Sequence, residues 1–293
     1  MTPEEYAAQQ ALITAGLAAY VQRLASLFVN ALLTPADWIR LMQVLFPEVE
    51  RRYAEAAALG RRFYDSQRAV YHPELPRNER LLSTLDFKQF VQNMEPARKE
   101  MSQADSPRSA VTKLALTAVR EVEMAGRRQI IGAVKNDNPD MIVGWARVAT
   151  GRETCAWCLM LISRGAELNH KGNFAYSSAQ AAGINLDDDT VLDLWRESGG
   201  DVEKFREDTA EFIEQWHTGC DCLAFPVFDV NNWPGRDAAL QAQRLWIEAT
   251  KEARRLIADG KARSNNLNKE TQNALRRRLY SGEIDPQSYA FAA

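Results

Sequence analysis

The sequence predicts an α+β protein that is predominantly α-helical, and three observations lead to this fold class. Both end regions, 1–136 and 231–293, show the three-to-four-residue apolar spacing of amphipathic helices. Between them, "MIVGWARVAT" (141–150) and "LAFPVFD" (223–229) are short runs rich in β-branched and aromatic residues, which predict strands. Proline and glycine mark the ends of these elements. We therefore predict three regions: helical 1–136, a small α+β domain over 137–230, and a helical tail over 231–293.

Helix start signals are clear in the first region. Thr2-Pro3-Glu4-Glu5 combines a capping hydroxyl, a proline at the first helical position and a glutamate that completes a capping box. Thr34-Pro35 and Ser106-Pro107 repeat the cap-then-proline signal. After Ser106, one apolar stripe recurs at helical spacing, formed by Val111, Leu114, Ala118, Val122 and Ala125. The prolines of "HPELPR" (72–77) predict a connector between helices.

In the second region, "NDNPD" (136–140) ends a helix before the first strand. "CLMLISRG" (158–165) predicts a short helix that ends at Gly165, and "SSAQAAG" (177–183) predicts another. The acidic stretch 186–215 is predicted to be helical, and Pro226 places the second strand at a sheet edge. In the tail, apolar spacing predicts a long helix that stops at Gly260 and a last helix over 269–281.

Composition limits the functions open to this chain. Its 293 residues are 46% apolar, which is enough for a sizeable core, and the formal charge of −3 gives no global basic field. Contact with nucleic acid would depend on a local patch such as Arg276–Arg278, although such runs are typical of solvated helix faces. The acidic "MTPEEY" start does not resemble a signal peptide, and Ala11–Leu33 falls short of a membrane span. We expect a soluble protein made in a cytoplasm.

All four cysteines fall in two short motifs. "TCAWCLM" holds Cys155 and Cys158, and "WHTGCDC" holds His217, Cys220 and Cys222 after a gap of 58 residues (159–216). Cys-x2-Cys is the usual half of a tetrahedral zinc site, and His-x2-Cys-x-Cys can supply the other half. Zinc takes four ligands and five candidates are present, so either Cys220 and Cys222 both bind and His217 lies outside the ligand set, or His217 displaces one of them. We favour Cys155, Cys158 and His217 with one of the last two cysteines. In a strand, Cys220 and Cys222 would point to one face.

Two other interpretations of the cysteines stay open. The cluster could be a cross-link without metal, made of disulfides or of buried thiols. Alternatively, Cys158 with His217 as base could form a protease dyad, or "CAWC" could be a redox dithiol. The motif is not followed by a clear parallel βαβ pattern, and extra cysteines occupy the place of a third orienting residue. We therefore assign no catalytic residue, with Cys158 and His217 as the alternative.

"GWARVATGRETCAWCLMLISRGA" followed by "HTGCDCLAFPVF" resembles the Mu F-like minor head proteins of tailed bacteriophages, particularly those of actinobacteriophages. The matching residues lie within Met141–Asp229 and are Trp145, Cys155, Cys158, Ser163, Arg164, Gly165, His217, Cys220 and Cys222. The acidic stretch between the two motif halves is longer than usual for the family, which suggests an insertion.

The resemblance implies a structural minor capsid protein that acts in head morphogenesis, with roles in DNA packaging or ejection. Its implied partners are the portal protein, the major capsid or scaffolding protein, and packaged DNA, with no membrane. It implies several copies in the virion, inside the capsid near the portal, after assembly in the host cytoplasm. The alternatives are a capsid maturation protease and a DNA-binding protein of the head interior. Zinc is the expected cofactor if the cluster binds metal.

Overall fold

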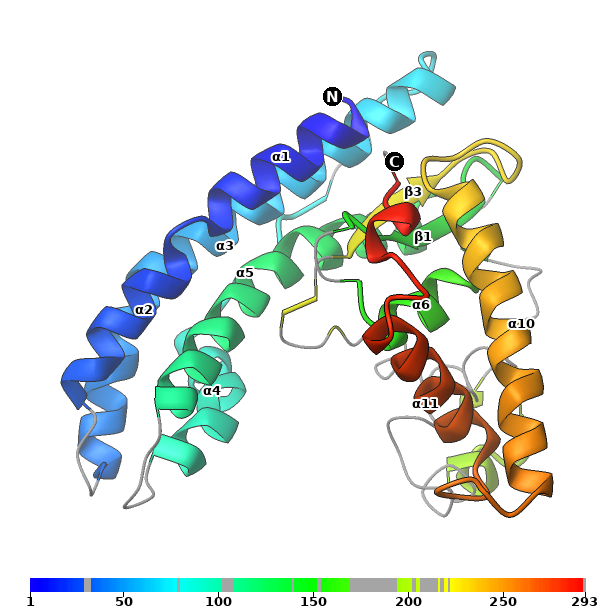
Figure 1. The fold of residues 1–293 in the computed structure, drawn as a ribbon. Helices are drawn as coiled ribbons and strands as arrows, with labels where there is room; N and C mark the ends of the chain where they lie inside the picture. The colour runs from blue at the N-terminus through cyan, green and yellow to red at the C-terminus, as the bar shows by residue number, and fades with distance from the viewer. Residues whose placement is uncertain are drawn as a thin grey trace. The chain divides into compact units, whose positions relative to one another are not determined.

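The structure is a computed structural model that describes residues 1–28, 33–77, 80–101, 108–138, 140–151, 154–168, 194–201, 204–205, 216, 219–220 and 222–291. These residues form two compact units. Figure 1 labels the helices and strands of both units. The first unit contains Met1–Asp137 with Trp216 and Gly219, and the second contains the other described residues from Asn138 onward. The predominantly helical α+β class is confirmed, whereas the division into three regions stays a prediction.

Long helices make up the first unit: α1 (Pro3–Thr14), α2 (Leu17–Ala25), the 3-10 turn η1 (Ser26–Phe28), α3 (Pro35–Tyr71), α4 (Phe87–Met101) and α5 (Arg108–Asn136). Two of the predicted caps are confirmed. The Thr2 side chain accepts from the Glu5 N–H in a complete capping box, and the Thr34 side chain accepts from the Asp37 N–H. The third cap, Ser106-Pro107, lies outside the described residues. The 72–77 connector and the helix end before "NDNPD" are confirmed.

The core of this unit lies between α2, α3, α4 and α5. The predicted α5 stripe is confirmed, because all five of its residues are buried there. Helices α3 and α5 approach so closely at Gly60 and Gly126 that a Cβ on Gly60 would lie 2.7 Å from the Gly126 carbonyl oxygen. Glycine at this crossing therefore lets two long helices bury their apolar sides against each other.

Contrary to our prediction, the N-terminal segment does not fall short of a membrane span in length and hydropathy. Pro3–Phe28 is long and apolar enough to cross a membrane by length and composition alone, a test that signal sequences and core helices also pass. In the structure this segment is divided at Gly16, whose φ is +74°. The second part, α2, buries Leu17, Val21 and Ala25 in the core.

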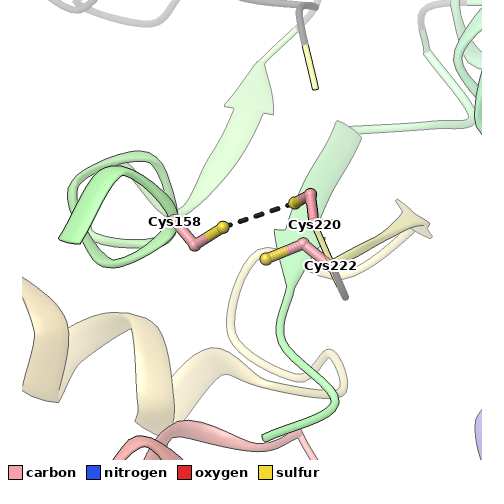
Figure 2. Close-up of side chains that lie close together, drawn as sticks. All are labelled: Cys158, Cys220 and Cys222. Carbon is pink, nitrogen blue, oxygen red and sulfur yellow. Dashed lines mark hydrogen bonds between the residues drawn. The ribbon is translucent and has the colours of Figure 1, made fainter. Parts of the chain in front are cut away.

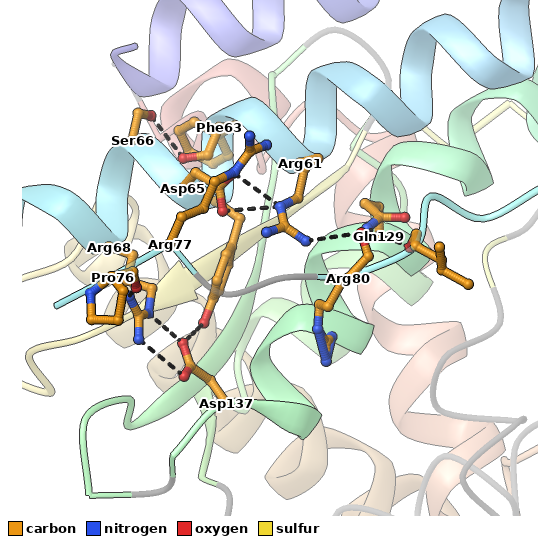
Figure 3. Close-up of polar contacts among 12 residues, drawn as sticks. Arg61, Phe63, Asp65, Ser66, Arg68, Pro76, Arg77, Arg80, Gln129 and Asp137 are labelled. Carbon is orange, nitrogen blue, oxygen red and sulfur yellow. Dashed lines mark hydrogen bonds and ion pairs between the residues drawn. The ribbon is translucent and has the colours of Figure 1, made fainter.

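A buried polar network lies at the end of α5. The Asp137 carboxylate accepts from Arg68 Nε at 2.7 Å and from the Tyr64 hydroxyl (Figure 3). Burial, together with this hydrogen bond, raises the pKa of Tyr64. Along the same side of α3, Arg61 donates to Asp65 at 2.9 Å. The network fixes the end of α5 against α3 through a pair of opposite charges that is nearly sealed from water.

In the second unit, three antiparallel strands run in the order β2-β1-β3: β1 (Gly144–Val148), β2 (Ala166–Leu168) and β3 (Leu223–Val227). Both predicted strands are confirmed, and β2 was not predicted. Pro226 pairs with Trp145 on the edge strand β3, as its missing N–H requires. The sheet therefore joins the two sequence motifs side by side through the central strand β1.

Helices α6 (Ala156–Ile162), α10 (Arg236–Ala258) and α11 (Leu267–Tyr280) pack around a second apolar cluster, and the 3-10 turn η2 (Pro286–Tyr289) follows. Both predicted tail helices are confirmed, and Gly260 and Gly282 follow their ends with positive φ. The short helix predicted over 177–183 lies outside the described residues, as does the 186–215 stretch apart from 194–201 and 204–205.

Candidate metal centre

The first half of the site is built by the N-terminus of α6. Cys155 is the N-cap residue, and its Sγ accepts the Cys158 N–H at 3.4 Å. A sulfur here replaces the hydroxyl or carboxylate oxygen that usually satisfies a free helix N–H. The capping geometry also brings the two sulfurs together, because Cys155 Sγ and Cys158 Sγ are 3.7 Å apart. The Cys-x2-Cys spacing therefore presents two thiols from one helix start.

The second half comes from the residues that precede β3. Cys220 and Cys222 lie directly before β3, which begins at Leu223 as predicted. Both cysteines are buried, with 1% and 0% exposure. The sulfurs of both cysteines point toward Cys158 (Figure 2).

The two halves meet at one point, which is shown in Figure 2. Cys158 Sγ lies 3.3 Å from Cys220 Sγ, and the sulfurs of Cys158, Cys220 and Cys222 all lie within 4.8 Å of one another. A disulfide needs about 2.05 Å between sulfurs, so the four cysteines are reduced thiols here. The buried thiols of Cys158, Cys220 and Cys222 form a group that could hold a metal ion, and the half-buried Cys155 lies beside Cys158. His217 lies outside the described residues, and its predicted ligand role stays a prediction.

The environment of Cys158 is unfavourable for nucleophilic chemistry. Hydrogen bonds with the neighbouring thiols of Cys155, Cys220 and Cys222, together with burial, raise the pKa of Cys158 well above its usual value. A reactive cysteine needs the opposite shift, because the thiolate is the nucleophile. It must also reach a substrate, whereas the Cys158 side chain has 0% exposure. These two properties count against the predicted alternative of a Cys158 protease.

Side-chain contacts stabilise both ends of α6, the helix that follows Cys155 and contains Cys158. Gln272 of α11 donates from Nε2 to the Ala156 carbonyl at 3.2 Å, in a buried position. We did not predict Gln272, although a polar residue on the buried side of an amphipathic helix was the available signal. At the other end of α6, Ser163 Oγ donates to the Met160 carbonyl, Arg164 stacks on Trp246 and Gly165 has a φ of +71°.

Comparison with known proteins places the chain in a family. Residues 2–249 match the model of the VG15 protein family. The chain belongs to this family. It is 75% identical over 294 residues to the "Gene 15 protein" of Mycobacterium phage L5, with all of both chains covered. It is 68% identical over 283 residues to the "Gene 15 protein" of Mycobacterium phage D29, covering 96% of this chain and all of the relative. No solved structure matches the chain.

The VG15 family members that match are phage proteins, so the predicted phage origin is confirmed. The family match includes both cysteine motifs and all of the sheet. The similarity to the two relatives extends through α10 and α11 as well.

Proposed function

We propose that this phage protein is a structural minor head protein of the Mu F-like kind, which associates with the portal vertex inside the capsid and acts in head assembly. The observation that carries the proposal is the cysteine cluster. It joins the start of α6 to the start of β3, which are the two motif halves on which the resemblance to Mu F-like proteins rests. The family's phage relatives are consistent with such a role.

The geometry favours a structural role over a capsid maturation protease. A protease dyad needs an accessible thiolate with a base beside it. Cys158 is buried, its thiol pKa is raised, and its sulfur contacts another cysteine. Three thiols packed around Cys158 are the environment of a cross-link rather than of a nucleophile.

We further propose that the cluster holds one zinc ion through Cys155, Cys158, Cys220 and Cys222. Tetrahedral Zn–S bonds of about 2.3 Å require sulfurs about 3.8 Å apart. The 3.7 Å between Cys155 and Cys158 is close to that spacing, and the 3.3 Å between Cys158 and Cys220 needs only a small adjustment. The sulfurs of Cys158, Cys220 and Cys222 lie within 4.8 Å of one another, and Cys155 would move toward Cys220 and Cys222 to complete the set. Such an ion would join α6 to the chain before β3 and would supply folding free energy rather than catalysis.

Metal content tests the ligand set. We expect one zinc per purified chain, reduced at least tenfold in each of four cysteine-to-serine variants and retained in His217→Ala. Tetrathiolate ligation also predicts intense sulfur-to-metal absorption after replacement of zinc by Co²⁺ in the wild-type protein. Wild-type protein that contains two disulfides and no metal would show that the cluster is an oxidised cross-link. Loss of zinc from His217→Ala with the fold intact would restore the histidine to the ligand set.

Coexpression tests the role in the head. The wild-type chain should copurify with the portal protein and appear near the portal in a density map of the procapsid, while coexpressed major capsid protein stays full-length. A well-folded Cys158→Ser or His217→Ala variant that loses a capsid-cleaving activity of the wild type would establish the protease instead.

A further inference from the structure

The positive charge of the chain is concentrated in its last two long helices. Residues 236–280 carry 11 Lys and Arg against five Asp and Glu, whereas the whole chain has 36 and 39 and a net charge of −3. The helices α10 and α11 thus form a basic region on an otherwise acidic protein. A concentration of this kind produces a local field that attracts polyanions, even when the net charge of the protein is negative.

Three cations of α10 lie along one side of the helix. Arg244, Lys251 and Arg255 are seven and four residues apart, a spacing that aligns them in one stripe, and all three are exposed. The buried residues of α10 occupy the opposite side and include Ala242, Ala249 and Ala253. We call Arg244, Lys251 and Arg255 the basic stripe. It faces away from the apolar cluster that α10 covers and extends over about 16 Å of helix.

Other cations of α10 and α11 pair with carboxylates, such as Arg277 and Arg278 with Glu252, but within the described part of the chain the two arginines of the basic stripe do not. Among the described residues, Arg244 and Arg255 have no carboxylate oxygen within 4.0 Å, and within the stripe only Lys251 pairs, with Glu248 at 2.8 Å. Cations around Glu248, with Lys251 first and then Arg278 and Arg255, lower the pKa of its carboxyl. Over its whole length, α10 carries five Lys and Arg against three Asp and Glu, an excess of two positive charges.

Helix α3 allows a comparison with other cations that lie on an exposed helix surface. There Arg40 pairs with Asp37 and both Arg51 and Arg52 pair with Glu48, whereas the exposed Arg62 has no carboxylate oxygen within 4.0 Å among the described residues. These i,i+3 and i,i+4 pairs neutralise the charge locally. In the basic stripe, two of three cations lack that neutralisation among the described residues and lie on the same side of one helix, an arrangement that can face a polyanion.

We propose that the basic stripe of α10 binds the phosphate backbone of double-stranded DNA. The three cations span the length of about five phosphates on one strand, which are about 3.4 Å apart along the duplex axis. Exposed guanidinium and ammonium groups bind phosphate without reading bases. The binding is therefore independent of sequence, and it rests on the proposed function only for the conclusion that this DNA is packaged in the head.

Fluorescence anisotropy with a labelled random-sequence duplex, titrated at several salt concentrations, tests the proposal. The triple variant Arg244→Ala/Lys251→Ala/Arg255→Ala should bind at least tenfold more weakly at low salt. Its slope of log affinity against log salt should be shallower by about three, because each phosphate contact contributes about 0.9. Alanine preserves the helix, which circular dichroism would verify.

The matched control removes the same charge elsewhere, in Arg40→Ala/Arg62→Ala/Lys88→Ala, from exposed helical positions of the first unit. We expect it to bind DNA within about twofold of wild type. Equal losses in both triple variants, or a wild type that does not bind the duplex at low salt, would overturn the proposal. So would a stripe variant that keeps DNA affinity but no longer copurifies with portal protein, since the stripe would then bind protein. Because the assay uses purified chain and duplex alone, failure of the head role would leave its result unchanged.

Discussion

The two compact units of this protein are stabilised in different ways. The first has long helices around one extended apolar core, with pairs such as Arg68–Asp137 sealed at its end. The second has three short strands, buries apolar side chains of β1, β3, α6, α10 and α11, and brings four thiols close together. A metal ion held by thiols adds folding free energy to the elements that it joins. The proposed zinc ion would therefore stabilise the second unit and leave the first unchanged.

The largest expected effect separates the two units directly. Cys158→Ser should destabilise the second unit by about 4 kcal/mol or more, because losses of this size come from removing a metal or a cross-link. Hydrogen exchange measured by mass spectrometry should rise over 144–168 and 222–291 and stay unchanged over 3–136. Met160→Leu, on the same buried helix, is the control and should cost less than about 1.5 kcal/mol. Equal exchange in both units would show that the cluster does not act locally.

The next effect concerns the polar end of the first unit. Asp137→Asn removes the charge that faces Arg68, and leaving a buried cation unpaired costs about 3 kcal/mol. Urea unfolding followed by circular dichroism would measure the loss. Asp140→Asn, at an exposed position three residues later, should change stability by less than about 0.5 kcal/mol. A neutral effect of Asp137→Asn would mean that the apolar core alone stabilises this unit.

A third variant tests the close approach of α3 and α5. Gly60→Ala would place a methyl group 2.7 Å from the Gly126 carbonyl oxygen, so the helices must separate. We expect a cost of about 2 kcal/mol from overpacking. Gly132→Ala on α5 is the control, since its methyl group would have only Arg80 Nη1 as a neighbour, at 4.0 Å. Helix propensity should make that control more stable by about 0.5 to 1 kcal/mol, and thermal unfolding would compare the two.

The smallest effect is electrostatic and depends on pH. Hydrogen bonds from Arg51 and Arg52 lower the pKa of Glu48 from 4.5 to about 2. A depressed carboxyl pKa stabilises the fold above pH 4.5, and this contribution disappears as the pH falls toward 2. Because the pair lies near the surface, we expect less than about 1 kcal/mol. Glu48→Gln should flatten the stability profile between pH 4.5 and 2, and an unchanged profile would show that the pair contributes nothing.

Local signals were enough to predict most of this fold. Capping chemistry at Thr2 and Thr34 and glycine after α10 and α11 gave helix ends to within about two residues. Strand β2 was missed because three residues, "AEL", carry no periodicity. Such a strand exists only because β1 offers it a pairing edge.

The candidate site was predictable in composition but not in geometry. Cysteine spacing predicted that the two motifs would converge, and they do. It could not show that Cys155 would act as a helix cap. Gln272 was missed because its contact with Ala156 joins residues 116 positions apart. Contacts of this range depend on how helices pack, which spacing within one motif does not determine.

The order of the strands allows the chain between β2 and β3 to vary in length. Strand β2 ends at Leu168 and β3 begins at Leu223, and both pair with β1, so both ends of the intervening chain are fixed by the same central strand. Closing a chain between two fixed points costs only about 0.6 kcal/mol more for each doubling of its length. Residues could therefore be added or removed between Leu168 and the buried Trp216 during evolution, or a reporter sequence inserted there by design, without altering the pairing that positions the thiols.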